Sequence, residues 1–183
     1  MKLAKVFKEN KQFTLFSILA LVVVGVAVFA PQIAPYDPLD AVMLESLQAP
    51  SSAHPFGTDK LGRDLLSRVI FGTRTSLIMT LCLVAVIFVI GTFLGVIAGY
   101  FGGIVDGVIM RIADMMISFP GLVLAIAIAG MLGPNLVNAV ISIAAVSWTK
   151  YARLARSLVM KIRDRDYVAA AIVTGSKTPY MLL

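Results

Sequence analysis

Long apolar runs alternate with shorter charged segments along this chain. The apolar runs cover residues 13–30, 77–98, 115–132 and 136–151. A helix that crosses the hydrocarbon core of a bilayer needs about 20 mostly apolar residues, so each run is predicted to span a membrane. Pro120 is expected to kink the third span. The short fourth span needs Lys150 to extend toward the interface beside Trp148 and Tyr151. The pattern therefore predicts an all-α fold, a polytopic membrane helix bundle with about four spans.

A secretory signal peptide is the alternative for the first apolar run, because basic residues precede it. The run is longer than the usual signal-peptide core of about 7–15 residues, and no convincing cleavage site precedes Pro31. The composition also favours a membrane protein, with 59% hydrophobic and 14% charged residues, where soluble domains have about 45–50% apolar and about 25% charged residues. We interpret the run as an uncleaved first span.

The distribution of charge predicts how the chain is oriented. The net charge is +6, and the basic residues concentrate in the N-terminal arm, residues 1–12, and in residues 152–183. The segment 31–76 is nearly neutral. Basic segments beside spans remain on the cytoplasmic side, so residues 1–12 and 152–183 are predicted to be cytoplasmic. With four spans, residues 99–114 are then also cytoplasmic and residues 31–76 are external. Basic residues placed beside spans do not indicate a nucleic-acid partner.

Three glycines recur at every fourth position of the second span, namely Gly91, Gly95 and Gly99. This spacing puts them on one helical face, where the absence of a side chain lets another helix approach closely. Ordinary enrichment of glycine in membrane helices is the alternative. We expect a helix–helix packing contact at these positions, although the sequence does not identify the partner helix.

The sequence offers no constellation for catalysis. It has no Walker-type phosphate loop, and the single histidine, His54, has no second ligand at metal-site spacing. No serine has a base nearby in sequence, and the single cysteine, Cys82, lies in an apolar run. Asp106, Arg111 and Asp114 are interpreted as a charge cluster at a membrane boundary. We therefore expect neither an enzyme nor a metal site.

The external segment contains a compact motif between His54 and Leu77. Pro, Gly and small polar residues at its start indicate turns, and Thr58 or Asp59 is expected to cap a helix. Apolar residues from Leu65 onward follow helical spacing, which predicts a short amphipathic helix that leads into the second span. The motif residues singled out are His54, Phe56, Gly57, Thr58, Asp59, Gly62, Arg63 and Asp64.

The segment after the fourth span predicts a docking surface on the cytoplasmic side. Apolar residues at Tyr151, Leu154, Leu158 and Ile162 alternate with basic ones, which is typical of a basic amphipathic helix at a membrane surface. A short alanine-rich helix, a glycine and a new helix start at Thr178-Pro179 follow. A plain loop is the alternative.

With these two motifs, the chain resembles the C-type permease subunits of bacterial ABC importers for dipeptides, oligopeptides and nickel. Four later landmarks occur in the family's order: Ala98–Gly103, Arg111–Asp114, Phe119-Pro120 and Trp148–Arg156. Several short motifs in one order are more specific than any of them alone, and the resemblance covers nearly the whole chain.

The resemblance implies the ABC importer permease fold and a coupling helix–loop–helix that docks on a separate ATPase. The residues at the implied coupling positions are Asp166, Tyr167, Val168, Ala169, Ala170, Ala171, Gly175 and Ser176, of which the first three, Ala170, Ala171 and Gly175 agree with the family's pattern. Ala169 stands where the family usually has glutamate. The implied partners are a second permease subunit in a heterodimer, two ATPase subunits, an external solute-binding protein and membrane lipid, with no nucleic acid. No cofactor is implied in this chain, since ATP and Mg belong to the ATPase. The implied location is the bacterial inner membrane, with multiple spans and a cytoplasmic N-terminus.

The resemblance also implies that a family member continues beyond Leu183 with two further spans, so we expect a fragment of a six-span protein. The implied function is ATP-driven import of peptides, nickel or metal chelates by alternating access. A non-transporting membrane anchor or assembly protein is the alternative. A channel is disfavoured because the predicted spans contain no charged constriction. The substrate cannot be read from these motifs.

Overall fold

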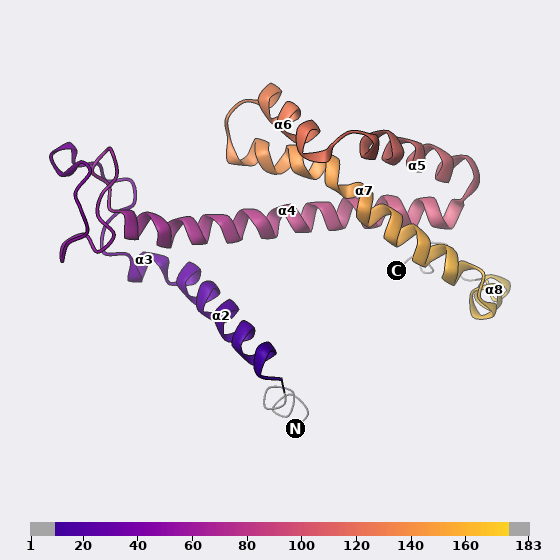
Figure 1. The fold of residues 1–183 in the computed structure, drawn as a ribbon. Helices are drawn as coiled ribbons and strands as arrows, with labels where there is room; N and C mark the ends of the chain where they lie inside the picture. Colours follow the sequence, from indigo (N-terminus) through magenta and orange to yellow (C-terminus); the bar gives the residue numbers. More distant parts are fainter. Residues whose placement is uncertain (1–9, 176–183) are drawn as a thin grey trace. The chain divides into compact units, whose positions relative to one another are not determined.

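The computed structural model describes residues 10–175, which form helices joined by turns and one longer loop segment (Figure 1). The chain divides into two compact units, Met1–Ile78 and Met79–Leu183. The helices are α2 (Lys11–Val28), α3 (Ala30–Ile33), α4 (Leu65–Phe101), α5 (Gly103–Ser118), α6 (Gly121–Leu132), α7 (Leu136–Arg163) and α8 (Asp166–Val173), and η1 (Met43–Glu45) is a short 3-10 turn. An all-helical chain agrees with the predicted fold class.

The first unit begins with α2, which coincides closely with the first predicted span. The helix stops at Phe29, and the short helix α3 restarts with Pro31 in its first turn, where a proline costs no hydrogen bond. Beyond α3 the chain forms the 34–64 segment, which contains η1 and a single bridge between Thr58 and Asp64. This segment ends where α4 begins.

Helix α4 contains two elements that the sequence pattern predicts as separate. The predicted amphipathic helix after Asp64 and the predicted span 77–98 form one uninterrupted helix, Leu65–Phe101. Its 37 residues correspond to about 55 Å at 1.5 Å per residue, which exceeds a hydrocarbon core of about 30 Å. The helix ends before Gly102, whose φ of +64° favours glycine.

The third predicted span has a different organisation in the structure. Helix α5 occupies most of the 99–114 stretch that was expected to be a loop, and it ends at Ser118. Helix α6 begins at Gly121, and its axis is turned by 93° from that of α5. The sequence predicted a kink at Pro120, but the change of direction is a break, since Phe119 and Pro120 both leave the helical region. Proline lacks the amide hydrogen that would continue the helix.

Helix α7 extends past the predicted end of the fourth span and includes the basic amphipathic stretch. Asn135 caps its start, accepting a 2.9 Å hydrogen bond from the backbone N–H of Val137. Helix α6 packs along α7 beyond the turn at Gly133. Trp148, whose expected place at the membrane interface stays a prediction, is buried against Ala113 of α5 and Ala152. These three residues form the core of the second unit.

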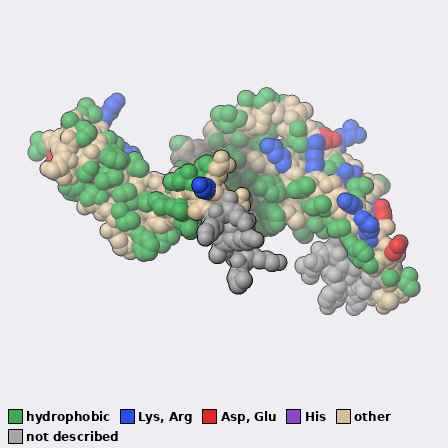
Figure 2. All heavy atoms as spheres, turned by 60° about the horizontal axis from the view of Figure 1, so that its bottom comes forward, with side chains coloured by type: hydrophobic (Ala, Val, Ile, Leu, Met, Phe, Trp, Pro, Cys, Tyr) green, Lys and Arg blue, Asp and Glu red, His purple; other side chains and the backbone are tan. Residues whose placement is uncertain are grey.

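Two described helices, α2 and α4, are long and apolar enough to cross a membrane, and α5 with α6 would be a third candidate if the bent pair is one span. Hydrophobic side chains cover much of the visible surface in Figure 2. Many large apolar side chains are exposed, including Leu21 of α2 and Leu81 of α4. Exposed apolar helices of this kind fit a lipid environment.

Candidate functional site

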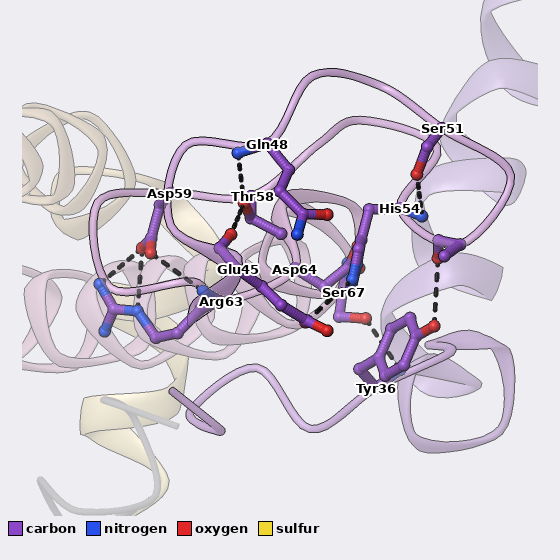
Figure 3. Close-up of polar contacts among 11 residues, drawn as sticks. Tyr36, Glu45, Gln48, Ser51, His54, Thr58, Asp59, Arg63, Asp64 and Ser67 are labelled. Carbon is purple, nitrogen blue, oxygen red and sulfur yellow. Dashed lines mark hydrogen bonds and ion pairs between the residues drawn. The ribbon is translucent and has the colours of Figure 1, made fainter. Parts of the chain in front are cut away.

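The 34–64 segment folds around His54, the single histidine of the chain. The ring is buried, and each ring nitrogen faces a carboxylate: Nδ1 lies 3.0 Å from Oδ1 of Asp64, and Nε2 lies 3.3 Å from Oε2 of Glu45. The Tyr36 ring lies against it, with the two ring centroids 4.9 Å apart. Figure 3 shows the imidazole enclosed by these three side chains. The histidine is thus a central hydrogen-bonding group of the segment.

Asp64 joins this segment to α4. Its Oδ2 accepts a 2.7 Å hydrogen bond from the backbone N–H of Ser67, so Asp64 caps the helix, in place of the Thr58 or Asp59 expected from the sequence. Burial opposes ionisation of this carboxyl group. The hydrogen bonds from Ser67 and His54 outweigh burial and hold the pKa of Asp64 below its ordinary value.

Thr58 and two glycines fix the turns of the motif. The buried Thr58 hydroxyl accepts from the Gln48 backbone N–H at 2.9 Å and donates to the carbonyl oxygen of Glu45. Gly57 and Gly62 both have φ of +74°. A Cβ atom at either position would overlap a backbone carbonyl oxygen of the same segment, that of Gln48 or Val42, so glycine is required at both.

Asp59 organises the charged side of the motif. Its carboxylate accepts hydrogen bonds from the backbone N–H groups of Leu61 and Arg63 and pairs with the guanidinium groups of Arg63 and Arg68. The hydrogen bond from the Arg63 side chain is the largest cause that holds the pKa of Asp59 well below its usual range. Phe56, the remaining motif residue, is about half exposed. The motif is therefore an internally hydrogen-bonded structural element.

The three glycines of α4 lie against α7. A Cβ atom at Gly91 would lie 2.6 Å from the carbonyl oxygen of Trp148, and one at Gly99 would lie 2.9 Å from that of Arg156. At Gly95 it would overlap the carbonyl oxygen of Ala152. The helix that approaches this face is therefore α7, and it does so backbone to backbone.

The charge cluster at 106–114 pairs with α7 rather than within itself. Arg156 contacts Asp106 through two hydrogen bonds, and Arg153 contacts Asp114. Arg163, in the last turn of α7, donates to the carbonyl oxygens of Gly99 and Tyr100 at 3.3 and 3.2 Å. Arginines of α7 thus contact both α5 and the end of α4.

The predicted coupling residues fall on α8 and the turn after it. Asp166, Tyr167, Val168, Ala169, Ala170 and Ala171 belong to α8, and Tyr167 and Val173 are exposed. Gly175 has φ of +85°, which agrees with a glycine-dependent turn. Ser176 and the expected helix start at Thr178-Pro179 lie outside the described residues.

Local sequence patterns do not reveal several tertiary contacts of the site, because the partners are far apart in sequence. The fully buried Ser67 accepts a 3.0 Å hydrogen bond from the backbone N–H of Tyr36, 31 residues away. Arg156 and Asp106 are 50 residues apart. Nothing local in the sequence indicates either pair, although the opposite charges on two amphipathic helices were a signal for the second.

Two family models match the chain. The model described as "Binding-protein-dependent transport system inner membrane component" matches residues 91–183, more than half of the chain, and the model "N-terminal TM domain of oligopeptide transport permease C" matches residues 2–50. The second match covers α2, and the first covers the glycine face of α4 with all helices that follow.

Curated relatives agree with these matches. The dipeptide transport system permease protein DppC of Haemophilus influenzae is 39% identical over 93% of this chain and 60% of its own length. The probable D,D-dipeptide transport system permease protein DdpC of Escherichia coli is 39% identical over 99% and 61%, and the nickel transport system permease protein NikC of E. coli is 40% identical over 78% and 51%. The chain thus spans about three fifths of the length of the first two relatives. It belongs to the family of inner membrane components of binding-protein-dependent transport systems.

Proposed function

We propose that this chain forms part of a permease subunit of an ATP-driven ABC importer, which moves peptides, nickel or metal chelates into the cell. The observation that carries the proposal is the short helix α8 with a positive-φ glycine after it, placed directly beyond a long basic helix. The names of the similar proteins support a solute of this class, since they specify transport of dipeptides or nickel.

The proposed mechanism is alternating access, and this chain contributes structure rather than hydrolytic chemistry. ATP with Mg is bound and hydrolysed on two separate ATPase subunits, which contact Asp166–Gly175. A second permease subunit forms the other half of the path, and an external solute-binding protein delivers the substrate. Membrane lipid surrounds α2 and the apolar part of α4, whose surfaces are largely exposed and hydrophobic.

The exposed side chains of α8 support a contact with a protein groove. Tyr167 is 63% exposed and Val173 is 87% exposed, and apolar side chains at such positions favour burial by a partner. Ala169 stands where the family usually has glutamate, so the contact relies on shape and apolar surface rather than on a charge at that position.

The proposed orientation places the N-terminus and residues 152–183 in the cytoplasm and the 34–64 segment outside. The experiment introduces Ser52→Cys or Ser176→Cys into a Cys82→Ser background and treats intact cells with a membrane-impermeant thiol reagent. We expect labelling at position 52 and none at position 176 until the membrane is permeabilised. The reverse pattern contradicts this orientation.

Transport itself is tested with the complete protein in cells that lack the gene. Uptake of radiolabelled dialanine and of radiolabelled nickel is measured with and without the restored gene, and proteins that co-purify are examined for a Walker-type ATPase. We expect energy-dependent accumulation of one of the two solutes and an ATPase in the complex. A complex with no ATPase and no accumulation of either solute supports the alternative of a membrane anchor.

A further inference from the structure

Helix α7 is the element that connects α8 to the rest of the second unit. It contacts α5 and α6, the three α4 glycines lie against it, and α8 follows it after two residues. The core residues Trp148 and Ala152 lie on this helix and pack against Ala113 of α5. A displacement of α8 can therefore reach α4 and α5 through α7.

The ion pair between Arg156 and Asp106 lies one helical turn beyond Ala152, on the way to α8. Nε and Nη2 of Arg156 each contact one carboxylate oxygen of Asp106. The two side chains are 31% and 17% exposed. A two-point pair with limited solvent access fixes both distance and angle between its helices, and breaking it leaves partly buried charges without a partner.

A second pair on α7 provides a natural comparison. Arg153 contacts Asp114 through one nitrogen, and these side chains are 47% and 60% exposed. Solvent-exposed pairs contribute little because water competes for both charges. The two pairs join the same two helices, so they differ mainly in burial and in the number of contacts.

Arg163 adds a contact at the α8 end of the same helix. Its guanidinium group donates to the last carbonyl oxygens of α4, at Gly99 and Tyr100, where a cation is favoured by the helix dipole. Asp166, the first residue of α8, lies three positions further along the chain. The end of α7 is thus attached to α4 immediately before α8 begins.

We propose that the Arg156–Asp106 pair, aided by Arg163, makes α4, α5 and α7 move as one body when α8 is displaced. The inference rests on the proposed function, because it requires that an ATPase displaces α8. Arg156 and Asp106 are then positioning residues for transport: they contact neither solute nor ATP. Without the pair, α7 can shift along α5 and the ATPase cycles without moving the solute.

The test replaces the ion pair by a removable cross-link. The variant Asp106→Cys with Arg156→Cys, in a Cys82→Ser background of the complete protein, is assembled with its ATPase. The solute is whichever of dialanine and nickel the unaltered complex transports. Uptake and ATP hydrolysis are then measured before and after treatment with a short bifunctional thiol reagent. We expect the uptake per ATP hydrolysed to fall at least fivefold before linking and to recover to within about twofold of wild type after linking.

The matched control is Asp114→Cys with Arg153→Cys, treated in the same way. Its uptake per ATP hydrolysed should stay within about twofold of wild type before and after linking. A purely structural role lowers the amount of complex and both rates together, so it leaves the ratio unchanged. The inference is overturned if the unlinked 106/156 variant has the uptake per ATP hydrolysed of wild type. It is also overturned if linking does not raise that ratio.

Arg156→Lys keeps the inference testable if the double variant does not assemble. Lysine retains the charge but makes a single-point contact, so we expect a two- to threefold lower ratio with a normal amount of complex. An unchanged ratio overturns the inference. If the wild-type complex contains no ATPase and moves neither solute, the proposed function fails, whereas transport with unaltered ratios in all pair variants refutes this inference alone.

Discussion

Glycine has opposite roles in the 34–64 segment and in the contact between α4 and α7. Gly57 and Gly62 have positive φ angles and form turns, whereas Gly91 and Gly95 are helical and let a neighbouring helix approach. The 34–64 segment is held by side-chain hydrogen bonds around His54 and Asp64 (Figure 3). The helix contact is held by packing of backbone on backbone.

We infer that the difference follows from two surroundings, lipid around the contact of α4 with α7 and water around the 34–64 segment. In lipid, burying apolar side chains between helices gains little, because lipid tails are equally apolar, so association depends on close packing of small residues. A loop segment in contact with water must instead satisfy its buried polar groups. In the described part of the chain, no buried side-chain nitrogen or oxygen lacks a partner. The same chain therefore uses packing in one region and hydrogen bonding in the other.

The largest effect is expected from Gly95→Leu. The new side chain would overlap the backbone of α7 at Ala152, and a backbone cannot give way as a flexible side chain can. Overpacking costs about 1–3 kcal/mol even where side chains can shift. We expect the yield of assembled complex, measured by size-exclusion chromatography in detergent, to fall at least fivefold.

Val96→Leu is the control, since it places the same leucine side chain at the next position of α4, where the side chain is only half-buried. Its yield is expected to remain within about twofold of wild type. Equal yields for the position-95 and position-96 variants would contradict the packing role of the glycine face.

A smaller effect is expected from Asp64→Ala in the other region. The variant removes the helix cap to Ser67 and the carboxylate that faces His54. Losing a cap alone costs about 0.5–2 kcal/mol, and a total near 2 kcal/mol corresponds to about thirtyfold more local opening. Protease cleavage within the 34–64 segment should accelerate by this factor. Asp40→Ala, at an exposed site, should leave the rate nearly unchanged, and equal acceleration by both would refute the hydrogen-bonded network.

Acid should loosen the 34–64 segment while leaving the glycine contact intact. The pKa values of Asp59 and Asp64 are both lowered in the folded chain, whereas unfolded aspartate titrates near about 3.9. The stabilisation is therefore complete above about pH 5 and is lost as the pH falls through the folded pKa values. A fluorophore at Ser52→Cys in the Cys82→Ser background should report this loss below about pH 4. Loss of structure between pH 6 and 8 would contradict the assignment.

The smallest effect is expected from Gly107→Ala in α5. Within the described part of the chain, a Cβ atom at this helical position would meet nothing within 4 Å, and alanine favours a helix over glycine by about 0.8–1.0 kcal/mol. The variant should therefore be as stable as wild type or slightly more stable in thermal unfolding. A marked loss of stability would show that small residues on α5 also serve a close contact.

Much of the helical organisation could be predicted from the sequence, because span length and glycine spacing are local properties. The limits of α2 follow from its apolar run, and the positive φ of Gly175 follows from glycine after a short helix. The sequence also indicated that Gly91, Gly95 and Gly99 share a face, although only the structure identifies α7 as the helix they approach.

The remaining features depend on tertiary contacts that local patterns do not encode. Trp148 resembles an interfacial aromatic residue, but its neighbours Ala113 and Ala152 leave room for its ring in the core. Asp106 lies near Arg111 in sequence, yet it forms an ion pair with Arg156, which joins α5 to α7. The continuous helix α4 also passes through the boundary that hydropathy suggested at residue 77.

The most direct test of the account compares Gly175→Val with Gly175→Asn in the complete protein. Among the described residues, no atom lies within 4 Å of a Cβ at this position, so the cost expected there arises from the backbone φ of +85°, which asparagine tolerates better than a β-branched residue. ATPase pull-down and solute uptake are measured on membranes that contain equal amounts of each variant. We predict that the valine variant inserts normally but either no longer binds the ATPase or takes up the solute at least tenfold more slowly. The asparagine variant should retain most of the ATPase binding and most of the uptake. Normal ATPase binding and normal uptake in the valine variant would contradict the proposal that this turn couples the chain to an ATPase.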